Sequence, residues 1–200
     1  MRAIKDCAVD EGIAMVLPRY VAFCFIALVI AFASPAAATA PECVAAPFVN
    51  TAGLAILKAA RQKSAPAFAR VAGRYTDLRG LAMYALGNHR RKLAKSREDE
   101  YVNLTRIFIG RVLAKNSSRF RANSLIVTGC AGSTRTPIVT ARLSSGQKVV
   151  FMLYKTRKGF LVRDVSVASV WLGQQLKTTF TGVINRQGGS VEALLDYLRG

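Results

Sequence analysis

The chain has 200 residues, with 29 Lys and Arg against 11 Asp and Glu, which gives a formal net charge of +18 at neutral pH. Hydrophobic residues make up 52% of it, so it is not a disordered polycation and has enough apolar material for a hydrophobic core. At this length a single domain with one core is expected.

The first feature along the chain is an apolar segment near the N-terminus. Residues 21–33 form an uncharged run of thirteen apolar residues, preceded by Arg19 and followed by the small residues SPAAATA. This order predicts a signal peptide over residues 1–40, cleaved after Ala38 or Ala40, with Met15 as an alternative start. The run is shorter than the roughly 20 residues that span a bilayer. The alternative is an uncleaved membrane anchor.

Residues 41–200 are then a single domain with an unchanged net charge of +18, because the first 40 residues contain three basic and three acidic residues. Nucleic acid is out of reach for an exported protein, so anionic lipid headgroups or acidic protein surfaces are the expected partners. The densest basic sites are residues 89–95 and the group Lys155, Arg157 and Lys158, which we expect to steer docking to such surfaces. The alternative is that the charge serves solubility alone.

Two of the four cysteines, Cys43 and Cys130, remain after export. An oxidising compartment permits one disulfide between them. Two cysteines and the single histidine, His89, cannot complete a standard four-ligand zinc site. The chain also has no Gly-rich phosphate loop, nucleophile elbow or other catalytic motif. We therefore expect no metal, no cofactor and no catalytic residue.

Residues 44–120 have the periodicity of helices. Asp77 is a good N-cap for a helix that ends before Gly87, a typical residue after a helix C-terminus. Further along, Leu104 and Phe108 belong to an apolar stripe at helical spacing, which predicts that they face the interior.

Residues 124–167 predict an antiparallel sheet of about four strands. The segments SLIVTGC, TPIVTARL, QKVVFMLYK and FLVRDVSV are separated by short turns. The third strand is apolar on both faces, with Phe151 pointing to one side and Met152 to the other. Both faces must therefore be covered, by helices, by a ligand or by both.

A charged pair, Arg163-Asp164, interrupts the apolar fourth strand. Neighbouring residues point to opposite sides of a strand, so the two side chains need not pair with each other. We expect Asp164 to be structural, accepting backbone N–H bonds at the strand-to-helix corner or meeting another arginine. Residues 170–198 return to helix, with Leu172 and Leu176 in an apolar stripe and a break at Gly188-Gly189.

The C-terminal segment resembles a known family. Residues 164–199, "DVSVASVWLGQQLKTTFTGVINRQGGSVEALLDYLR", are similar to the pattern D-V-x-V-E-G-V-S, then R-x-x-F, then I-x-R-x-G-G-x-V-x-x-L-L-x-x-L-R. This pattern is that of the MlaC/toluene-tolerance family of periplasmic lipid-binding proteins, and the branch associated with hopanoid biosynthesis is the most similar. Asp77, the Leu86-Gly87 pair, Leu104 and Phe108 fit the helical part of the family, so the likeness covers residues from about 46 to 199.

Several positions depart from the family pattern. This chain has Ala168-Ser169 where the family pattern has Glu-Gly, Trp171 where it has Ser, and Lys177 where it has Arg. It also has Phe160 in place of Trp and "NHRR" in place of Tyr-Trp-Arg. These changes indicate a divergent paralogue.

The resemblance implies an α+β fold in which helices pack around one curved antiparallel sheet and enclose an apolar lipid pocket, a shape similar to NTF2-like proteins. It implies a periplasmic carrier that moves phospholipid or a hopanoid-type lipid between inner- and outer-membrane complexes of an ABC-type transport system, with transient membrane contact, as a monomer. Combined with strand alternation, it predicts a lipid-binding set: Leu104, Phe108, Val150, Met152, Tyr154, Val165, Val167, Leu172 and Leu176. The five sheet residues are expected on one side, if pairing follows the short turns. Asp77, Asp164, Gly188 and Gly189 are expected to be structural.

Two other functions stay open. A divergent adaptor of the inner-membrane transporter, without cargo, would be favoured if Trp171 filled the pocket. An exported NTF2-like enzyme would be favoured by a His-Asp pair inside the pocket.

Overall fold

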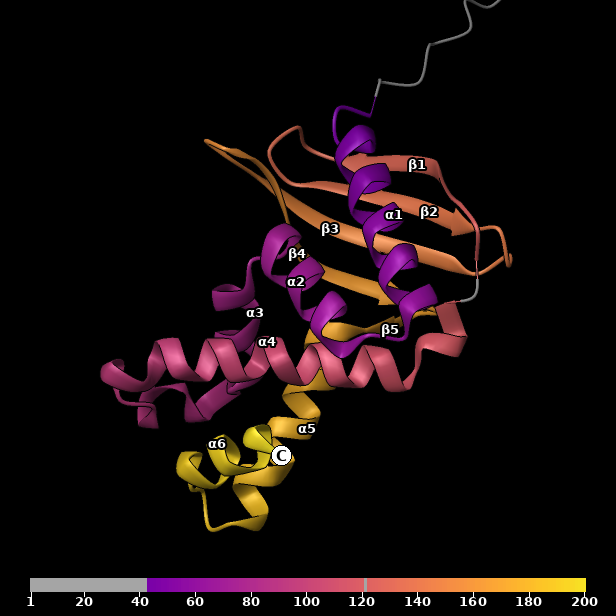
Figure 1. Cartoon of the computed structure of the whole chain (residues 1–200). Helices are drawn as coiled ribbons and strands as arrows, with labels where there is room; N and C mark the ends of the chain where they lie inside the picture. The colour runs from indigo at the N-terminus through magenta and orange to yellow at the C-terminus, as the bar shows by residue number, and fades with distance from the viewer. Residues whose placement is uncertain (1–42, 121) are drawn as a thin grey trace, which may run out of the picture. The chain divides into compact units, whose positions relative to one another are not determined.

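The computed structural model describes residues 43–120 and 122–200 (Figure 1). The predicted signal peptide over residues 1–40 lies outside the described residues. Among the residues that are described, no helix is both long enough and apolar enough to cross a membrane.

Helices come first in the chain, then a sheet, then two more helices. The elements are α1 (Ala46–Gln62), α2 (Ala65–Tyr75), α3 (Leu78–Ala85), the 3-10 helices η1 (Gly87–Lys92) and η2 (Lys95–Arg97), α4 (Glu98–Lys115), η3 (Ser117–Phe120), β1 (Leu125–Gly132), β2 (Pro137–Leu143), β3 (Lys148–Thr156), β4 (Gly159–Val167), β5 (Val170–Trp171), α5 (Leu172–Arg186) and α6 (Val191–Arg199).

Short polar side chains begin three of the helices. The Ser64 hydroxyl accepts the N–H of Ala67 at α2, and the Asp77 carboxylate accepts the N–H of Gly80 at α3. Ser190 caps α6 in the same way. Gly188 and Gly189, between α5 and α6, both have positive φ angles, 63° and 85°. Glycine adopts this conformation without the steric cost that a Cβ would bring.

The strands form one antiparallel sheet in the order β1-β2-β3-β4-β5. The α+β class is confirmed, with five strands where about four were predicted. The additional strand, β5, pairs Val170 and Trp171 with the end of β4, where the sequence indicated the start of a helix. It forms because Ala168 and Ser169 both take positive φ angles, 49° and 67°, and turn the chain back in a tight hairpin.

One face of the sheet, the inner face, packs against α1, which crosses β1 to β3 in Figure 1. The inner face carries Val139 and Ala141 of β2 and Phe151 of β3, all almost completely buried with Leu57 of α1. A second cluster joins α3, α4, α5 and α6 around Tyr101 and Phe180. Close packing of α2 on α4 depends on Gly110, because a Cβ there would lie 2.5 Å from the carbonyl oxygen of Ala65.

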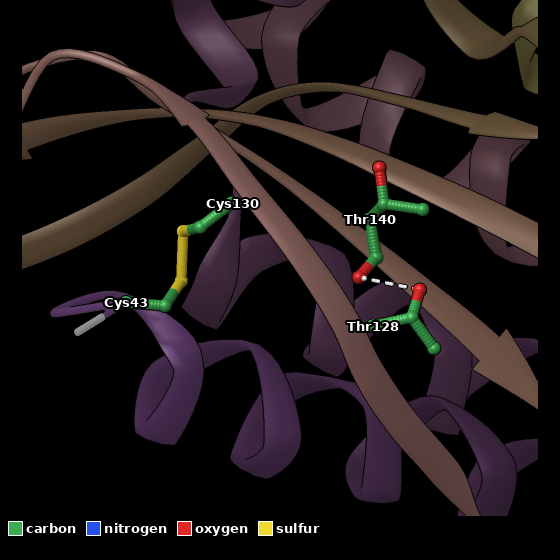
Figure 2. Close-up of a disulfide and its surroundings, with 4 residues drawn as sticks. All are labelled: Cys43, Thr128, Cys130 and Thr140. Carbon is green, nitrogen blue, oxygen red and sulfur yellow. Dashed lines mark hydrogen bonds between the residues drawn. A yellow bond between two sulfur atoms is a disulfide. The ribbon is translucent and has the colours of Figure 1, made fainter. Parts of the chain in front are cut away.

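A disulfide joins Cys43, just before α1, to Cys130 of β1 (Figure 2). It links residues 87 apart in sequence and fixes the start of α1 to the first strand. Beside it, Thr128 is the extra residue of a bulge in β1, between the pairs Val127↔Ala141 and Gly129↔Thr140. Figure 2 shows the Thr128 hydroxyl donating to the carbonyl oxygen of Thr140, at 3.4 Å.

Candidate functional site

An apolar cavity lies between the inner face of the sheet and the helices. It has a volume of about 60 Å³. Its wall comes from α1 to α5 and from β3 and β4, and the only polar side chains in it are those of Tyr75 and Thr76. The lining residues are Ala52, Ile56, Phe68, Val71, Ala72, Tyr75, Thr76, Leu81, Ile109, Leu113, Phe151, Val162, Val165 and Leu172. An apolar group is the only ligand that such a wall favours.

An aromatic group stands at the end of the cavity where Tyr75 lies. The ring of Phe48 in α1 packs edge-on against Tyr75, with centroids 5.9 Å apart, and against Phe160 of β4 at 6.1 Å. The guanidinium of Arg74 lies 5.6 Å from the centre of the Tyr75 ring. These contacts place an exposed cation beside an aromatic group formed by α1, α2 and β4.

The cavity is small compared with a lipid chain. A space of about 150 Å³ is needed for one benzene-sized molecule, whereas this cavity measures about 60 Å³. Several lining side chains on α1 and α2, including Ile56, Val71 and Tyr75, are only partly buried. An acyl chain would therefore require a wider cavity than the one described.

Of the nine residues predicted to bind lipid, Val165 and Leu172 line this cavity. Val167 also faces inward and packs on the α1–sheet core, but does not line the cavity. The cavity-lining residues of α1 and α2, of which Ile56 and Val71 are examples, were not among the predicted lipid-binding residues. The run of small residues in Ala65–Tyr75 was a signal that this helix approaches its neighbours closely.

The expectation that five sheet residues lie on one side is wrong. Phe151 pairs with Val165 and Val149 with Val167 on the inner face, whereas Val150 pairs with Ser166 and Met152 with Asp164 on the opposite, outer face. The reason is a bulge at Arg163. Leu153 pairs with Val162 and its neighbour Met152 pairs with Asp164, so Arg163 is an extra residue of β4 without a partner in β3. One inserted residue moves all following side chains of β4 to the other face. Val150, Met152 and Tyr154 are therefore separated from the cavity by the sheet.

Three predicted helix residues also lie elsewhere. Leu104, Phe108 and Leu176 pack in the cluster formed by α3 to α6. The Phe108 ring contacts Phe180 at 5.4 Å and Tyr197 at 5.7 Å. The reason is that α4 has two apolar sides, and the side with Ile109 and Leu113 is the one that meets the cavity. The apolar periodicity of α4 identified the side with Leu104 and Phe108 instead. Periodicity cannot distinguish the two apolar sides of this helix, because they differ only in which elements pack against them.

A more open hollow of about 700 Å³ lies on the outer face, between α3 and the strands β3 and β4. Met152, Tyr154, Tyr84 and Arg163 line it, with the carboxylates of Asp77 and Asp164. Burial and then the nearby Asp77 carboxylate raise the pKa of Tyr154, and the Arg163 charge opposes this shift. The mixture of charges and rings does not form a lipid-chain site.

Asp164 occupies the corner between the sheet and α5. Its Oδ1 accepts the backbone N–H groups of Val165, at 2.8 Å, and Gly173, at 2.9 Å. The residue before α5, Trp171, has no capping side chain, so Asp164 supplies the cap from the neighbouring strand. Burial raises the pKa of the Asp164 carboxyl, and the two N–H donors oppose that shift.

Trp171 and His89 do not line the cavity. Trp171 pairs with Ser166 on the outer face, and His89 belongs to the 3-10 helix η1. Within residues 43–120 and 122–200, no three His, Cys, Asp or Glu side chains gather in a way that could hold a metal ion.

The geometry defines a class of protein, an α+β domain in which an antiparallel sheet and several helices enclose an apolar cavity. The family model described as "MlaC protein" matches residues 51–200, and the chain belongs to the MlaC family. A solved structure with the same fold is the phospholipid-binding protein from Ralstonia solanacearum in complex with a phospholipid. It is 17% identical, with a TM-score of 0.65, and the match covers 78% of this chain and 94% of that one. A search of curated proteins finds no match.

Proposed function

We propose that this protein is a periplasmic lipid carrier, which holds acyl chains between the inner face of the sheet and α1, α2 and α4. The observation that carries the proposal is the apolar cavity, whose wall contains only two polar side chains, Tyr75 and Thr76. Membership of the MlaC family supports it. So does the fold that the chain shares with a phospholipid-binding protein.

The physical basis of binding is the transfer of methylene groups out of water. Each buried CH₂ contributes about 0.8 kcal/mol, so a wall without polar groups is sufficient to hold an acyl chain. We propose that the acyl chain enters beside Tyr75. The rings of Phe48, Tyr75 and Phe160 meet there by aromatic packing, so they can separate at a low cost in free energy. The guanidinium of Arg74 is then well placed to meet the phosphate of the headgroup.

The carrier would exchange lipid with inner- and outer-membrane complexes of an ABC-type system, as a monomer. The cargo would be a phospholipid or a hopanoid-type lipid. The adaptor without cargo loses the feature that would have favoured it, because Trp171 lies outside the cavity wall.

The test compares two substitutions on adjacent strands. Val165→Phe adds bulk to the inner face, and Val150→Phe adds the same bulk to the outer face, since Val150 pairs with Ser166, the neighbour of Val165. Residues 41–200 are purified, the bound lipid is extracted into organic solvent, and its class is identified by mass spectrometry. We expect wild type and Val150→Phe to yield lipid in equal amounts and Val165→Phe to yield little.

The melting temperature of each delipidated variant checks that it folds. Wild-type protein that carries no lipid from cells and takes up none from vesicles would contradict the proposal. Equal lipid in both variants would show that the cavity is not the binding site.

A further inference from the structure

Acidic and basic side chains are distributed unevenly over the molecule. Residues 101–163 contain no Asp or Glu at all. Most of the described carboxylates lie on the helices and are paired. Arg79 binds Glu98 and Asp99, Arg97 binds Glu100 and Glu192, and Arg199 binds Glu100 and Asp196. The strands of the sheet contain one carboxylate, Asp164, against four basic side chains, so the sheet has a positive potential.

The outer face of the sheet combines this charge with exposed apolar side chains. Ile126 and Ile138 are 63% and 37% exposed. Ile126 pairs with Arg142, and Ile138 pairs with Met152 across the strands β2 and β3. The same face carries Lys148, and Arg163 lines its hollow.

Arg142 and Lys148 are directly opposite each other in the antiparallel pair. Like charges in this position destabilise a sheet. The Arg142 guanidinium donates to the carbonyl oxygen of Gly146, and no described carboxylate forms a salt bridge with either residue. Two carboxylates line the hollow of this face, and backbone N–H groups already engage both: Asp164 accepts from Val165 and Gly173, and Asp77 accepts from Gly80. An anionic surface would relieve the repulsion between the charges of Arg142 and Lys148.

We propose that the outer face of the sheet docks on the surface of an anionic lipid bilayer. Ile126 and Ile138 enter the headgroup region, while Arg142, Lys148 and Arg163 meet lipid phosphates. A bilayer fits better than an acidic protein, because cations that form no salt bridge with a described carboxylate can meet the mobile phosphates of a fluid surface, and exposed isoleucines gain free energy from entering it. The inference deepens the proposed function by assigning the membrane contact of a carrier to one face.

The test measures binding of the purified domain, residues 41–200, to vesicles. One set contains phosphatidylcholine alone, and the other contains equal amounts of phosphatidylcholine and phosphatidylglycerol. The variant R142Q/K148Q/R163Q removes three charges from the docking face. Its matched control, R90Q/R91Q/K95Q, removes three exposed charges from the 89–95 segment, for which no ion pair is found among the described residues.

We expect wild type to bind the anionic vesicles and not the neutral ones. Each basic residue near an anionic surface changes affinity about fivefold, so the docking-face variant should bind about a hundredfold more weakly. The control should lose less than about fivefold, through long-range attraction alone. I126S/I138S should weaken binding even at high salt, because its loss is apolar.

The single tryptophan of the chain, Trp171, provides an internal reporter on this face, opposite Ser166. Brominated lipids should quench its emission in the wild-type protein, and addition of salt should restore it. Equal losses in the charge variant and its control, or binding without quenching, would overturn the proposal. So would a failure to bind anionic vesicles. None of these outcomes depends on whether the protein carries lipid in its cavity. Failure of the docking proposal can therefore be distinguished from failure of the carrier proposal, which the lipid-extraction test measures.

Discussion

The two faces of the sheet differ although β3 offers apolar residues to both. On the inner face Phe151 is 1% exposed and lines a cavity, while on the outer face Met152 is only partly buried and lines an open, charged hollow. The same kind of side chain therefore contributes to a core in one direction and to a surface in the other. What decides between them is where the helices lie, and α1 and α2 lie on the inner side.

The disulfide fixes the start of α1, the helix that covers the inner face, to β1. Its loss should cause the largest decrease in the free energy of unfolding. Closing a loop across a separation of 87 residues stabilises the fold by about 4–5 kcal/mol in the chain-entropy model. Denaturant unfolding of the Cys43→Ser/Cys130→Ser variant should show a loss of this size. Two free thiols in the denatured, unreduced wild-type protein would contradict the expectation.

Truncations on neighbouring residues of β3 compare the faces directly. Phe151→Ala should cost about 3–5 kcal/mol, since it removes a fully buried ring from the inner face. Met152→Ala should cost about 1 kcal/mol, because that side chain is only partly buried. Chemical denaturation of both variants measures the difference. Equal losses would mean that the outer face is as well covered as the inner one.

Asp164 couples the outer face to α5, so its removal should have an intermediate effect. Asp164→Ala deprives the N–H of Gly173 of its acceptor and should cost about 1–2 kcal/mol, the range found for helix caps. Thermal unfolding would measure this loss. A variant that is as stable as wild type would show that water replaces the carboxylate at no cost.

The same residue predicts a dependence on pH. Burial raises the folded-state pKa of Asp164 above its unfolded value, so its contribution to stability increases as the pH falls through the folded pKa. Arg97 and Arg199 lower the pKa of Glu100, whose contribution is lost over the acidic range instead. Asp164→Asn removes only the first effect. Melting temperatures between neutral pH and about pH 4 should therefore fall more steeply in Asp164→Asn than in wild type.

The smallest expected effect concerns the turn between β4 and β5. Ser169 has a φ angle of 67°, which a residue with a Cβ adopts only at a cost. Ser169→Gly should raise the free energy of unfolding by about 0.5–1 kcal/mol. Ser145→Gly, in an exposed turn where φ is not positive, should lower it slightly. A loss of stability in Ser169→Gly would show that the side chain has a role that its backbone angle conceals.

The local signals for this fold were strong. The apolar periodicity, the caps Ser64, Asp77 and Ser190 and the short turns between strands predicted most elements, because each depends on residues close together in sequence. The motif in residues 164–199 led to the family, which the match over residues 51–200 confirms. The hopanoid-associated branch stays a prediction.

The candidate site was harder to predict, and Arg163 shows why. Extrapolation from the β3–β4 turn pairs Val150 with Val165, but the bulge at Arg163 pairs Phe151 with Val165 instead. Nothing local in the alternation of β4 requires that insertion. It is favoured by contacts distant in sequence, where the N–H of Asp77 donates to the carbonyl oxygen of Val162 and Asp164 accepts the N–H of Gly173.

By itself, the sequence determined the α+β class, the order of the elements, the basic charge and the two cysteines available for a disulfide. Those properties follow from composition and from interactions within a few residues. The tertiary structure was needed to show which face of β3 meets the helices, which side of α4 lines the cavity, and that Ile126 and Ile138 stay exposed beside Arg142 and Lys148, which form no salt bridge with a described carboxylate. These depend on strand register and helix placement, where a shift of one residue exchanges the two faces while the hydrophobic pattern stays the same.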